Sequence, residues 1–233
     1  MKALILAAGF GSRLVPITNY KPKSLVKVNG TPIIFKQIEN LEENGIHDIT
    51  IITGYLSSVI NEVLRKNYPE VRIITNKDYA KTNNMYSAYL AGEIFKSDLL
   101  MMNADVFFDS CIISSLLNCS FPNAIAVDKA RYLKESMKIS FDGIRIKKIS
   151  KEISPVEAYG TSIDVYKFSR EGAIKFFEKC RYYIEEKNEL NLWSEVALDS
   201  ILSKEVFLPC DITGRWVEID NHEDLKIAQR LFA

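Results

Sequence analysis

Residues 3–14 read Ala-Leu-Ile-Leu-Ala-Ala-Gly-Phe-Gly-Ser-Arg-Leu, an apolar run that leads straight into two glycines, a hydroxyl and an arginine. The run from Ala3 to Ala8 is short and aliphatic, as expected for a strand that is buried on both faces of a parallel sheet. Gly9 and Gly11 permit backbone conformations that other residues avoid, and they let main-chain amides approach an anion closely. The stretch therefore predicts a buried strand that ends in an anion-binding turn.

Two cations follow this turn. Arg13 offers a permanently charged fork, and Lys23, within Lys21-Pro22-Lys23-Ser24-Leu25, offers a compact mobile charge. Glycine amides and two cations together suit the phosphates of a nucleoside triphosphate, so the leading interpretation is a nucleotide-handling enzyme. The plainer alternative is a tight strand-to-helix turn with an exposed arginine, and the Pro-Lys-Ser-Leu segment counts against it.

Other glycine-rich phosphate loops do not match this spacing. The dinucleotide fingerprint requires a glycine or alanine where Leu14 stands, and an acidic residue that closes the second strand. That strand, expected at residues 48–53, is followed by Gly54 and Tyr55. The Gly-Lys-Ser/Thr string of a Walker A loop is absent as well.

The segments Leu6–Leu14 and Pro22–Leu25 together resemble the sugar-nucleotidyltransferase superfamily, whose hallmark is Leu-Ala-Ala-Gly-x-Gly-Ser/Thr-Arg-Leu followed by Pro-Lys-x-Leu. The resemblance implies a Rossmann-like, three-layer αβα fold with a mostly parallel mixed sheet and a small hairpin insertion for the acceptor. It also implies transfer of a nucleotidyl group from a nucleoside triphosphate to a phosphorylated acceptor, with release of pyrophosphate. Arg13 and Lys23 are then the expected catalytic residues. The expected nucleotide contacts from this part of the family pattern are Leu6, Ala8, Gly9, Gly11, Ser12 and Ala104.

Composition narrows the class of protein further. The 233 residues include 30 basic and 30 acidic side chains, so no net charge favours a nucleic acid as partner. No apolar segment reaches the roughly 20 residues that span a bilayer, and the N-terminus carries no cleavable signal, so we expect a cytoplasmic protein that binds no membrane. The four cysteines form no Cys-x-x-Cys pair and only two histidines are present, which disfavours structural zinc and predicts reduced thiols.

Strand and helix patterns alternate through the first half of the chain. The expected elements are strands at 3–8, 48–53, 71–75 and 98–102 and helices at 31–44, 57–66 and 85–94. After Asp128 the pattern changes, and Asp142-Gly143 predicts a two-residue hairpin turn between strands at 137–140 and 144–149. We expect one domain, with a nucleotide-binding half at 1–128 and an acceptor-binding half at 129–233.

Two aspartates are candidates for a metal site. Asp105 follows a buried strand, at the sheet edge where ligands bind in open α/β folds. Asp220 ends the segment Trp216-Val-Glu218-Ile-Asp220, which reads as a strand with both acids on one face. Two carboxylates suit Mg²⁺, and the family resemblance implies a metal ligand at both positions. The alternatives are that Asp105 caps a turn, that Asp220 or Asn221 caps the last helix, or that Glu218 takes the second role.

One segment bears on which nucleobase the protein binds. Asn83-Asn84-Met-Tyr86-Ser87 resembles small bacterial cytidylyltransferases that activate phosphocholine and related phospho-alcohols. Asn83, Asn84 and Ser87 carry amides and a hydroxyl suited to a pyrimidine edge, and capping of a helix is their competing role.

The acceptor site is expected from the second half of the chain. Its candidate residues are Lys138, Glu157, Gly160 and Trp193. Lys138 would bind the acceptor phosphate, and Glu157 or Glu195 would pair with an ammonium group or with hydroxyls. Four aromatic residues are candidates for a cage around a trimethylammonium head: Tyr86, Tyr159, Trp193 and Trp216. The segment from Asp142 to Tyr166 also resembles cytidylyltransferases that act on inositol phosphate, so the acceptor stays open.

Three functions remain in competition. The first is transfer of CMP from CTP to a phosphorylated small alcohol or polyol such as phosphocholine, for surface polysaccharide or lipid decoration. The second is a sugar-1-phosphate nucleotidyltransferase that uses UTP, dTTP or GTP. The third, a catalytically silent regulator, is disfavoured because every motif residue is present. A homo-oligomer is left open.

Overall fold

The computed structural model describes all 233 residues and is built on a nine-stranded sheet. The strands of this sheet are, in chain order, β1 (Lys2–Ala7), β4 (Ile49–Thr53), β5 (Arg72–Thr75), β6 (Leu99–Asn103), β8 (Ala124–Asp128), β9 (Lys138–Phe141), β10 (Ile146–Ser150), β11 (Gly160–Phe168) and β12 (Leu208–Asp211). Two short ribbons accompany it: β2 (Lys27–Val28) with β3 (Thr31–Pro32), and β7 (Val106–Phe108) with β13 (Trp216–Glu218).

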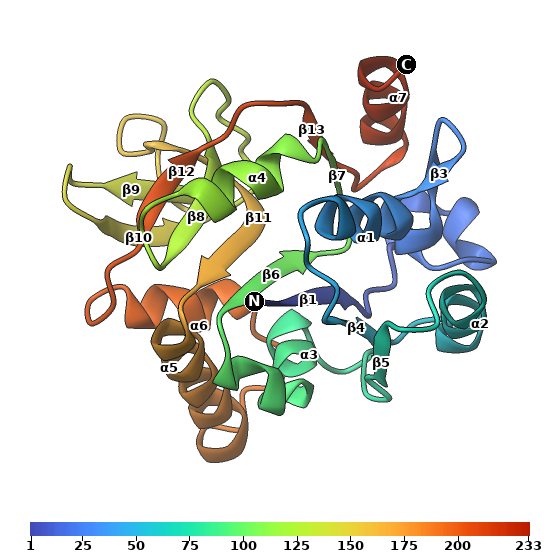
Figure 1. Ribbon diagram of the computed structural model, residues 1–233, viewed down its shortest axis with the longest axis horizontal. Helices are drawn as coiled ribbons and strands as arrows, with labels where there is room; N and C mark the ends of the chain where they lie inside the picture. Colours follow the sequence, from blue (N-terminus) through green and yellow to red (C-terminus); the bar gives the residue numbers. More distant parts are fainter.

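The sheet has a parallel part and an antiparallel part (Figure 1). β1 lies between β4 and β6 and is parallel to both, and β5 continues this parallel arrangement beyond β4. β11 then pairs antiparallel with β6, β8 and β9, while β12 is parallel to β8. The predicted α/β fold with a mixed sheet is confirmed, and each antiparallel pair of this sheet includes a strand that follows Asp128.

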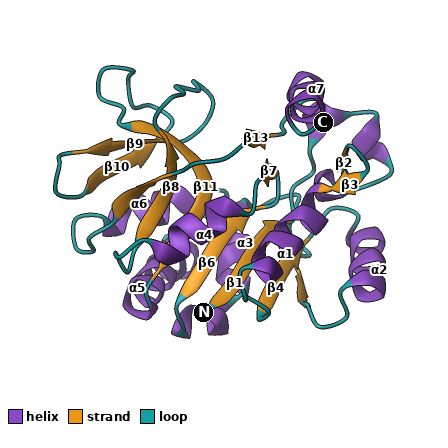
Figure 2. Cartoon of the chain, turned by 45° about the horizontal axis from the view of Figure 1, so that its top comes forward, coloured by secondary structure: helices purple, strands orange, loops and turns teal.

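Helices cover both faces of the sheet. They are α1 (Ile33–Glu43), α2 (Ser57–Asn67), α3 (Asn84–Leu90), α4 (Cys111–Asn118), α5 (Arg170–Arg181), α6 (Ser194–Ile201) and α7 (His222–Leu231). Successive residues of β1 point to opposite faces, so Ala3 and Ile5 belong to one core, with α1, α2 and α4, whereas Leu4 and Leu6 belong to a second, with α3, α5 and α6. Figure 2 shows α1 and α4 in front of the sheet and α3 and α6 behind it, which is the expected three-layer arrangement.

The predicted hairpin is present, but its turn is longer than two residues. β9 ends at Phe141 and β10 begins at Ile146. The carboxylate of Asp142 accepts hydrogen bonds from the amides of Ile144 and Arg145, so the side chain takes donors that a strand at these positions would have offered to its neighbour. The sequence-based start of the second strand at 144 was therefore wrong by two residues.

A third, smaller core joins the two ends of the chain. Leu14 from the N-terminal turn packs in one cluster with Val217 of β13 and with Leu225 of α7. This contact brings the segment after β13 back to the first motif of the sequence.

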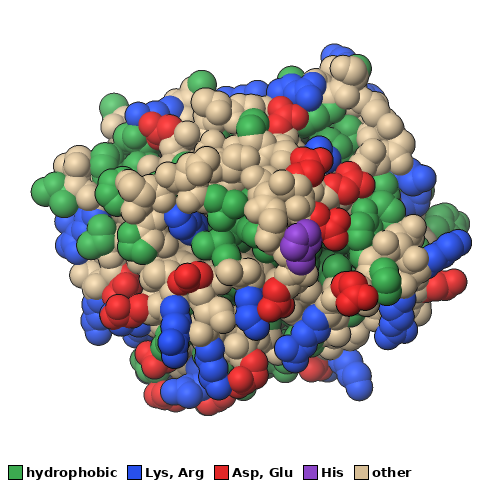
Figure 3. All heavy atoms as spheres, in the orientation of Figure 1, with side chains coloured by type: hydrophobic (Ala, Val, Ile, Leu, Met, Phe, Trp, Pro, Cys, Tyr) green, Lys and Arg blue, Asp and Glu red, His purple; other side chains and the backbone are tan.

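The molecular surface shows no segregation of charge on the face in Figure 3, where basic and acidic side chains are interspersed. All four cysteines are free thiols. None of the helices has the length and apolar character required to cross a membrane.

Candidate active site

A cavity of about 250 Å³ lies where β1 and β6 end. Its wall includes residues from both halves of the chain, as expected for a site at the carboxyl edge of a parallel sheet. The sequence-predicted residues that line it are Leu6, Ala8, Gly9, Arg13, Lys23, Asn83, Asn84, Ser87, Ala104, Asp105, Trp193 and Asp220.

The N-terminal turn brings the two parts of the first motif into contact. Gly11 adopts a left-handed conformation with φ of 68°. A Cβ atom at this position would lie 2.9 Å from Cβ of Lys23, so only glycine fits both the dihedral and the space. Gly11 and Ser12 do not line the cavity; Gly11 instead lets the segment that carries Lys23 pack closely against the turn.

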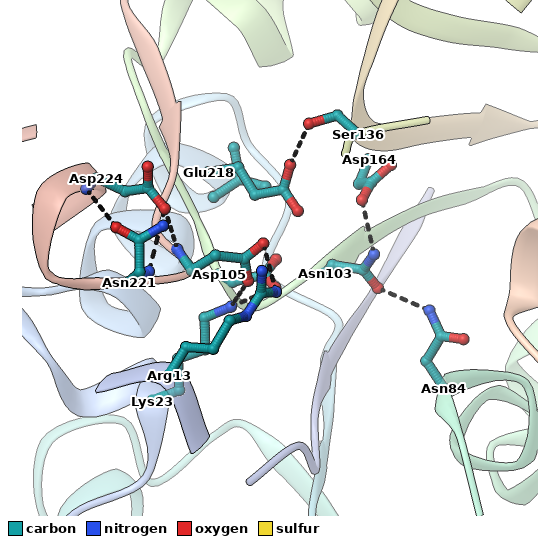
Figure 4. Close-up of polar contacts among 12 residues, drawn as sticks. Arg13, Lys23, Asn84, Asn103, Asp105, Ser136, Asp164, Glu218, Asn221 and Asp224 are labelled. Atoms are coloured by element: carbon teal, nitrogen blue, oxygen red, sulfur yellow. Dashed lines mark hydrogen bonds and ion pairs between the residues drawn. The ribbon is translucent and has the colours of Figure 1, made fainter. Parts of the chain in front are cut away.

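Lys23 lies at the centre of a charged cluster, shown in Figure 4. Its Nζ atom is 2.9 Å from Oδ2 of Asp105 and 2.6 Å from Oδ1 of Asp220. Nη2 of Arg13 is 2.8 Å from the other carboxylate oxygen of Asp220. The four residues that the sequence assigned to catalysis and metal binding therefore form one constellation.

Mutual attraction keeps Lys23 and Asp220 ionised. Burial alone would lower the pKa of Lys23, but the charges of Asp105 and Asp220 outweigh it and raise that pKa above its ordinary value. Burial opposes ionisation of Asp220 as well, yet Lys23 and Arg13 hold its pKa below its usual range. Lys23 is thus a fixed positive charge rather than a proton donor at neutral pH.

Asp220 is positioned by the start of α7. Asn221 is the N-cap, and its side chain accepts hydrogen bonds from the amides of Glu223 and Asp224. In return, the carboxylate of Asp224 accepts from the amides of Asp220 and Asn221, which completes a capping box. Of the two capping alternatives, Asn221 is the N-cap, which leaves the carboxylate of Asp220 directed at Lys23.

Asp105 is held close to Asp220 by the ribbon that β7 and β13 form. The amide of Ala104 donates to Leu6 of β1, and the carbonyl of Asp105 accepts from the amide of Ile219. β7 and β13 pair antiparallel directly beyond it, with Val106 opposite Glu218. Pairing of these two strands brings carboxylates 115 positions apart in the sequence into one site.

The acidic group fits a hard divalent cation. One carboxylate oxygen from each of Asp105, Glu218 and Asp220 lies within 4.8 Å of the others. Oδ1 of Asp105 is buried and has no hydrogen-bond partner in the protein, which is an unusual cost unless a ligand takes this oxygen. Carboxylate oxygens in this number are suitable ligands for such an ion.

Glu218 joins this group from β13. Burial, with the nearby charges of Asp105 and Asp220, raises the pKa of Glu218 to about 7. The hydroxyl of Ser136 donates to its carboxylate at 2.7 Å. Glu218 was considered from the sequence as a partner of Asp220, and the structure places it in the same cluster.

Where α3 lines the cavity, polar side chains are engaged in local hydrogen bonds. Asn83 is the N-cap of α3 and accepts from the amide of Asn84. Asn84 accepts from the amide of Ser194 at 2.7 Å and donates to Asn103 at 3.3 Å. Ser87 accepts from the side chain of Asn76. The capping alternative for Asn83 is thus seen directly, and its free side-chain NH₂ group remains available to a ligand.

Three of the expected acceptor residues lie away from the cavity. Lys138 is fully buried, and its Nζ atom donates to the carbonyl of Lys134 at 2.8 Å. Glu157 is bound to the hydroxyl of Ser154 on the surface. Gly160 packs against β8, where a Cβ atom would lie 2.5 Å from a methyl group of Val127. Their local bonds and packing occupy all three in structural roles.

The aromatic cage expected from the sequence is not assembled. Trp193 lines the cavity with 45% of its surface exposed, but Trp216 is buried and donates to Asp128. The hydroxyl of Tyr159 bonds to Asp211 instead, and Tyr86 packs against Tyr89. Of the four rings, only that of Trp193 therefore lines the cavity.

Sequence reasoning missed several residues of the cavity wall, among them Asn103, Lys151 and Asp164. Nζ of Lys151 lies 4.7 Å from the centroid of the Trp193 ring, so a cation already occupies one face of that ring. An acidic residue between Ile163 and Val165 of a strand-like segment was a readable signal for Asp164, because a buried charge in a strand requires a partner. Lys151 lies in a polar segment and gave no such signal.

A glycine-rich turn, a lysine bridge and a carboxylate cluster thus meet in one cavity, an arrangement suited to a nucleotidyltransferase. A family model described as nucleotidyl transferase matches residues 2–136. The chain belongs to the nucleotidyl transferase family.

Two relatives and one solved structure show which members of this family the chain is similar to. The CTP:phosphoglutamine cytidylyltransferase of Campylobacter jejuni is 32% identical, and the alignment covers 97% of this chain and 98% of the relative. The choline-phosphate cytidylyltransferase of Streptococcus pneumoniae is 53% identical over 40% of each chain. The solved structure of the CTP:phosphocholine cytidylyltransferase of Streptococcus pneumoniae superimposes with a TM-score of 0.82 at 26% identity, covering 100% of this chain and 99% of that one.

Proposed function

We propose that this nucleotidyltransferase transfers CMP from CTP to a small phosphorylated alcohol or polyol such as phosphocholine and releases pyrophosphate. The bridge from Lys23 to Asp105 and Asp220 is the observation that carries this proposal, because it joins both motifs in one cavity. The named activities of the similar proteins support CTP as the donor.

The proposed chemistry consists mainly of positioning and charge neutralisation. An oxygen of the acceptor phosphate attacks the α-phosphorus in line, and pyrophosphate leaves on the opposite side. Arg13 and the amides of the N-terminal turn hold the β- and γ-phosphates. Lys23 lies between the α-phosphate and the attacking phosphate and reduces the repulsion between two anions. No general base is needed because a phosphate dianion is already nucleophilic.

We further propose Mg²⁺ as the cation of the acidic cluster, held by Asp105 and Asp220 with Glu218 beside them. When bound, it neutralises charge that develops on the phosphoryl oxygens. Asp220 pairs with both Lys23 and Arg13 and would also hold the proposed ion, and the capping box of α7 aligns its backbone for these contacts.

The charge balance of the cavity favours an acceptor that carries a cationic nitrogen. Five carboxylates line it against three cations. Lys23 and Arg13 offset Asp105 and Asp220, and the proposed Mg²⁺ offsets Glu218. Lys151 is then opposite two further acids, Asp164 and Glu195. A phosphorylated amino alcohol complements this wall better than a neutral polyol phosphate.

Pyrophosphate release tests the proposal directly. The purified protein is incubated with Mg²⁺, one nucleoside triphosphate at a time, and a panel of phosphocholine, phosphoethanolamine, inositol 1-phosphate and glucose 1-phosphate. We expect turnover with CTP and an amino-alcohol phosphate. Turnover with UTP, dTTP or GTP and glucose 1-phosphate would establish the sugar-nucleotide alternative instead, and no release with any pair would overturn both.

A further inference from the structure

A chain of hydrogen bonds lies in the cavity wall, apart from the charged cluster around Lys23. Asn84 donates to Asn103, and Nδ2 of Asn103 donates to Oδ2 of Asp164 at 3.0 Å, as Figure 4 shows. The hydroxyl of Tyr166 lies 2.8 Å from Oδ1 of Asp164 and 3.0 Å from Oε1 of Glu195. These contacts join α3, β6, β11 and α6 around one tyrosine hydroxyl.

The number of protons on these three groups determines how many of their contacts can be hydrogen bonds. A tyrosine hydroxyl carries one proton, yet this one faces two carboxyl groups at hydrogen-bond distance. If both acids were ionised, one of the two contacts would place two oxygens together with no proton between them. Both contacts are hydrogen bonds when one carboxyl is protonated and donates to the tyrosine oxygen. The group Asp164–Tyr166–Glu195 therefore accommodates one extra proton.

No cation of the protein replaces that proton. None of the ion pairs in the structure involves Asp164 or Glu195. Asp164 faces negative groups on neighbouring elements, namely Asp105 after β6 and Glu218 on β13. Cys180 of α5 faces Glu195, and Lys151 reaches the same cavity but lies over Trp193.

These surroundings favour the protonated form. Burial, and then the charges of Glu195, Glu218 and Asp105, raise the pKa of Asp164 well above its ordinary value. Burial also raises the pKa of Glu195, and the backbone and side-chain hydrogen bonds that it accepts only partly oppose this. Both directions agree with the proton count.

The backbone at Asp164 is held for this contact. Its φ of 57° is in the left-handed region, which an aspartate adopts at a cost. The pairing of β11 with β8 shifts register between Ser162 and Tyr166, an irregularity of the kind that redirects side chains beside active sites. The bond from Asn103 then fixes the carboxylate in place.

We propose that the group Asp164–Tyr166–Glu195 holds one shared proton in the substrate-free protein and releases it when a positively charged acceptor binds. This inference rests on the proposed function, because it takes the acceptor to lie against the wall that carries Trp193 and Glu195. The only bond that breaks is the O–H bond of one carboxyl group, which becomes a carboxylate as its proton passes to solvent water. Acceptor affinity then rises with pH, by up to about tenfold per pH unit while the group is protonated.

The test compares two acceptors of one shape that differ in charge. Phosphocholine and its uncharged isostere 3,3-dimethylbutyl phosphate are titrated by calorimetry into the protein with Mg²⁺ and a non-hydrolysable CTP analogue. Repeating this in buffers of different ionisation enthalpy gives the protons released. Subtracting the value for the isostere removes the protons that come from binding of the phosphate group itself. We expect phosphocholine to release about one proton more than the isostere.

Two variants identify the source of the proton. Glu195→Gln and Asp164→Asn each keep the shape of the side chain, and each should reduce the difference to about zero. Melting curves establish that each variant is folded, and either one suffices for the test. Glu185→Gln is the matched control, because Glu185 accepts from Tyr89 at 2.7 Å in a similar pair outside the cavity. That variant should release the same number of protons as the parent.

The outcomes separate this inference from the function on which it rests. Equal proton release by phosphocholine and the isostere, with phosphocholine turned over normally, would overturn the inference and leave the proposed function intact. Turnover of inositol 1-phosphate or glucose 1-phosphate but of no amino-alcohol phosphate would also overturn it. Absence of pyrophosphate release with every acceptor would overturn both.

Discussion

The proposed nucleotide side and the proposed acceptor side of the cavity differ in how their residues are held. On the nucleotide side, Arg13 and Lys23 come from one short stretch of sequence and meet carboxylates in direct ion pairs. On the acceptor side, Asp164, Trp193 and Glu195 come from β11 and from the start of α6, and the two acids meet no cation of the protein. The nucleotide side is balanced in charge as it stands, whereas the acceptor side gains its balance from a proton or a ligand.

Removal of Lys23 should have the largest effect. Lys23→Ala deletes the charge between Asp105 and Asp220, and we expect kcat to fall by at least about 10²-fold, the scale for loss of a preorganised charge. Lys21→Ala is the matched control and should stay close to the parent, because Lys21 forms no ion pair. A Lys23→Ala enzyme with parental kcat in the pyrophosphate assay would refute its assignment.

On the acceptor side, Trp193→Ala should act on one substrate only. Loss of the exposed ring face should raise KM for phosphocholine roughly 2- to 30-fold, the range expected from one cation–π contact. KM for CTP should change far less. Tyr182→Ala, which removes a ring that also contacts a lysine, serves as the control outside the cavity. Equal effects on both KM values would break the proposed division between the sides.

Metal affinity should depend on pH through Glu218. Burial with Asp105 and Asp220 raises its pKa to about 7, so below that pH a proton competes with the metal. The metal concentration for half-maximal activity should rise as pH falls, by up to about tenfold per unit. In Glu218→Gln this dependence should be flat, and an unchanged slope would exclude Glu218 as the titrating group.

Lys138 tests the difference between stability and recognition. Lys138→Met keeps the length of the side chain but leaves the carbonyls of Leu133 and Lys134 without their donor. We expect a loss of about 1–3 kcal/mol in the free energy of unfolding. KM for phosphocholine should stay near the parental value. A selective rise in that KM with no change in melting temperature would instead show that Lys138 contributes to acceptor binding.

The smallest effect is expected at the cap of α7. Asn221→Ala removes the side-chain acceptor of the capping box and should cost about 1 kcal/mol, or roughly 2–4 °C in melting temperature. Asn221→Asp keeps an acceptor and should lose less. Because the same box aligns Asp220, kcat should fall modestly in Asn221→Ala, and the aspartate variant should recover it.

Many residues predicted for nucleotide binding lie in one cavity because they are close together in the sequence. The strand, the turn and Lys23 lie within 25 positions, and apolar periodicity located the parallel strands that follow. Asp105 and Asp220 were found by the same logic, as charges that terminate apolar segments.

The acceptor side was harder to predict because its contacts are non-local. Lys138 and Glu157 have suitable chemistry, but one is buried under its own loop and the other is bound to Ser154. Asp164 enters the cavity through a register shift in β11, which no periodic pattern reports. Which of several plausible side chains faces a cavity is decided by such irregular pairing, and residue type alone does not determine it.

The tight contact between Gly11 and Lys23 has a consequence for mutational tolerance. A methyl group at position 11 would press on the side chain that carries the central positive charge, so even alanine there should impair activity. A methyl group at Gly9 would meet no atom within 4 Å, so that position is sterically free to accept alanine. In a library of variants, positions 11 and 23 should therefore show strong epistasis, with no residue at 11 tolerated independently of the lysine.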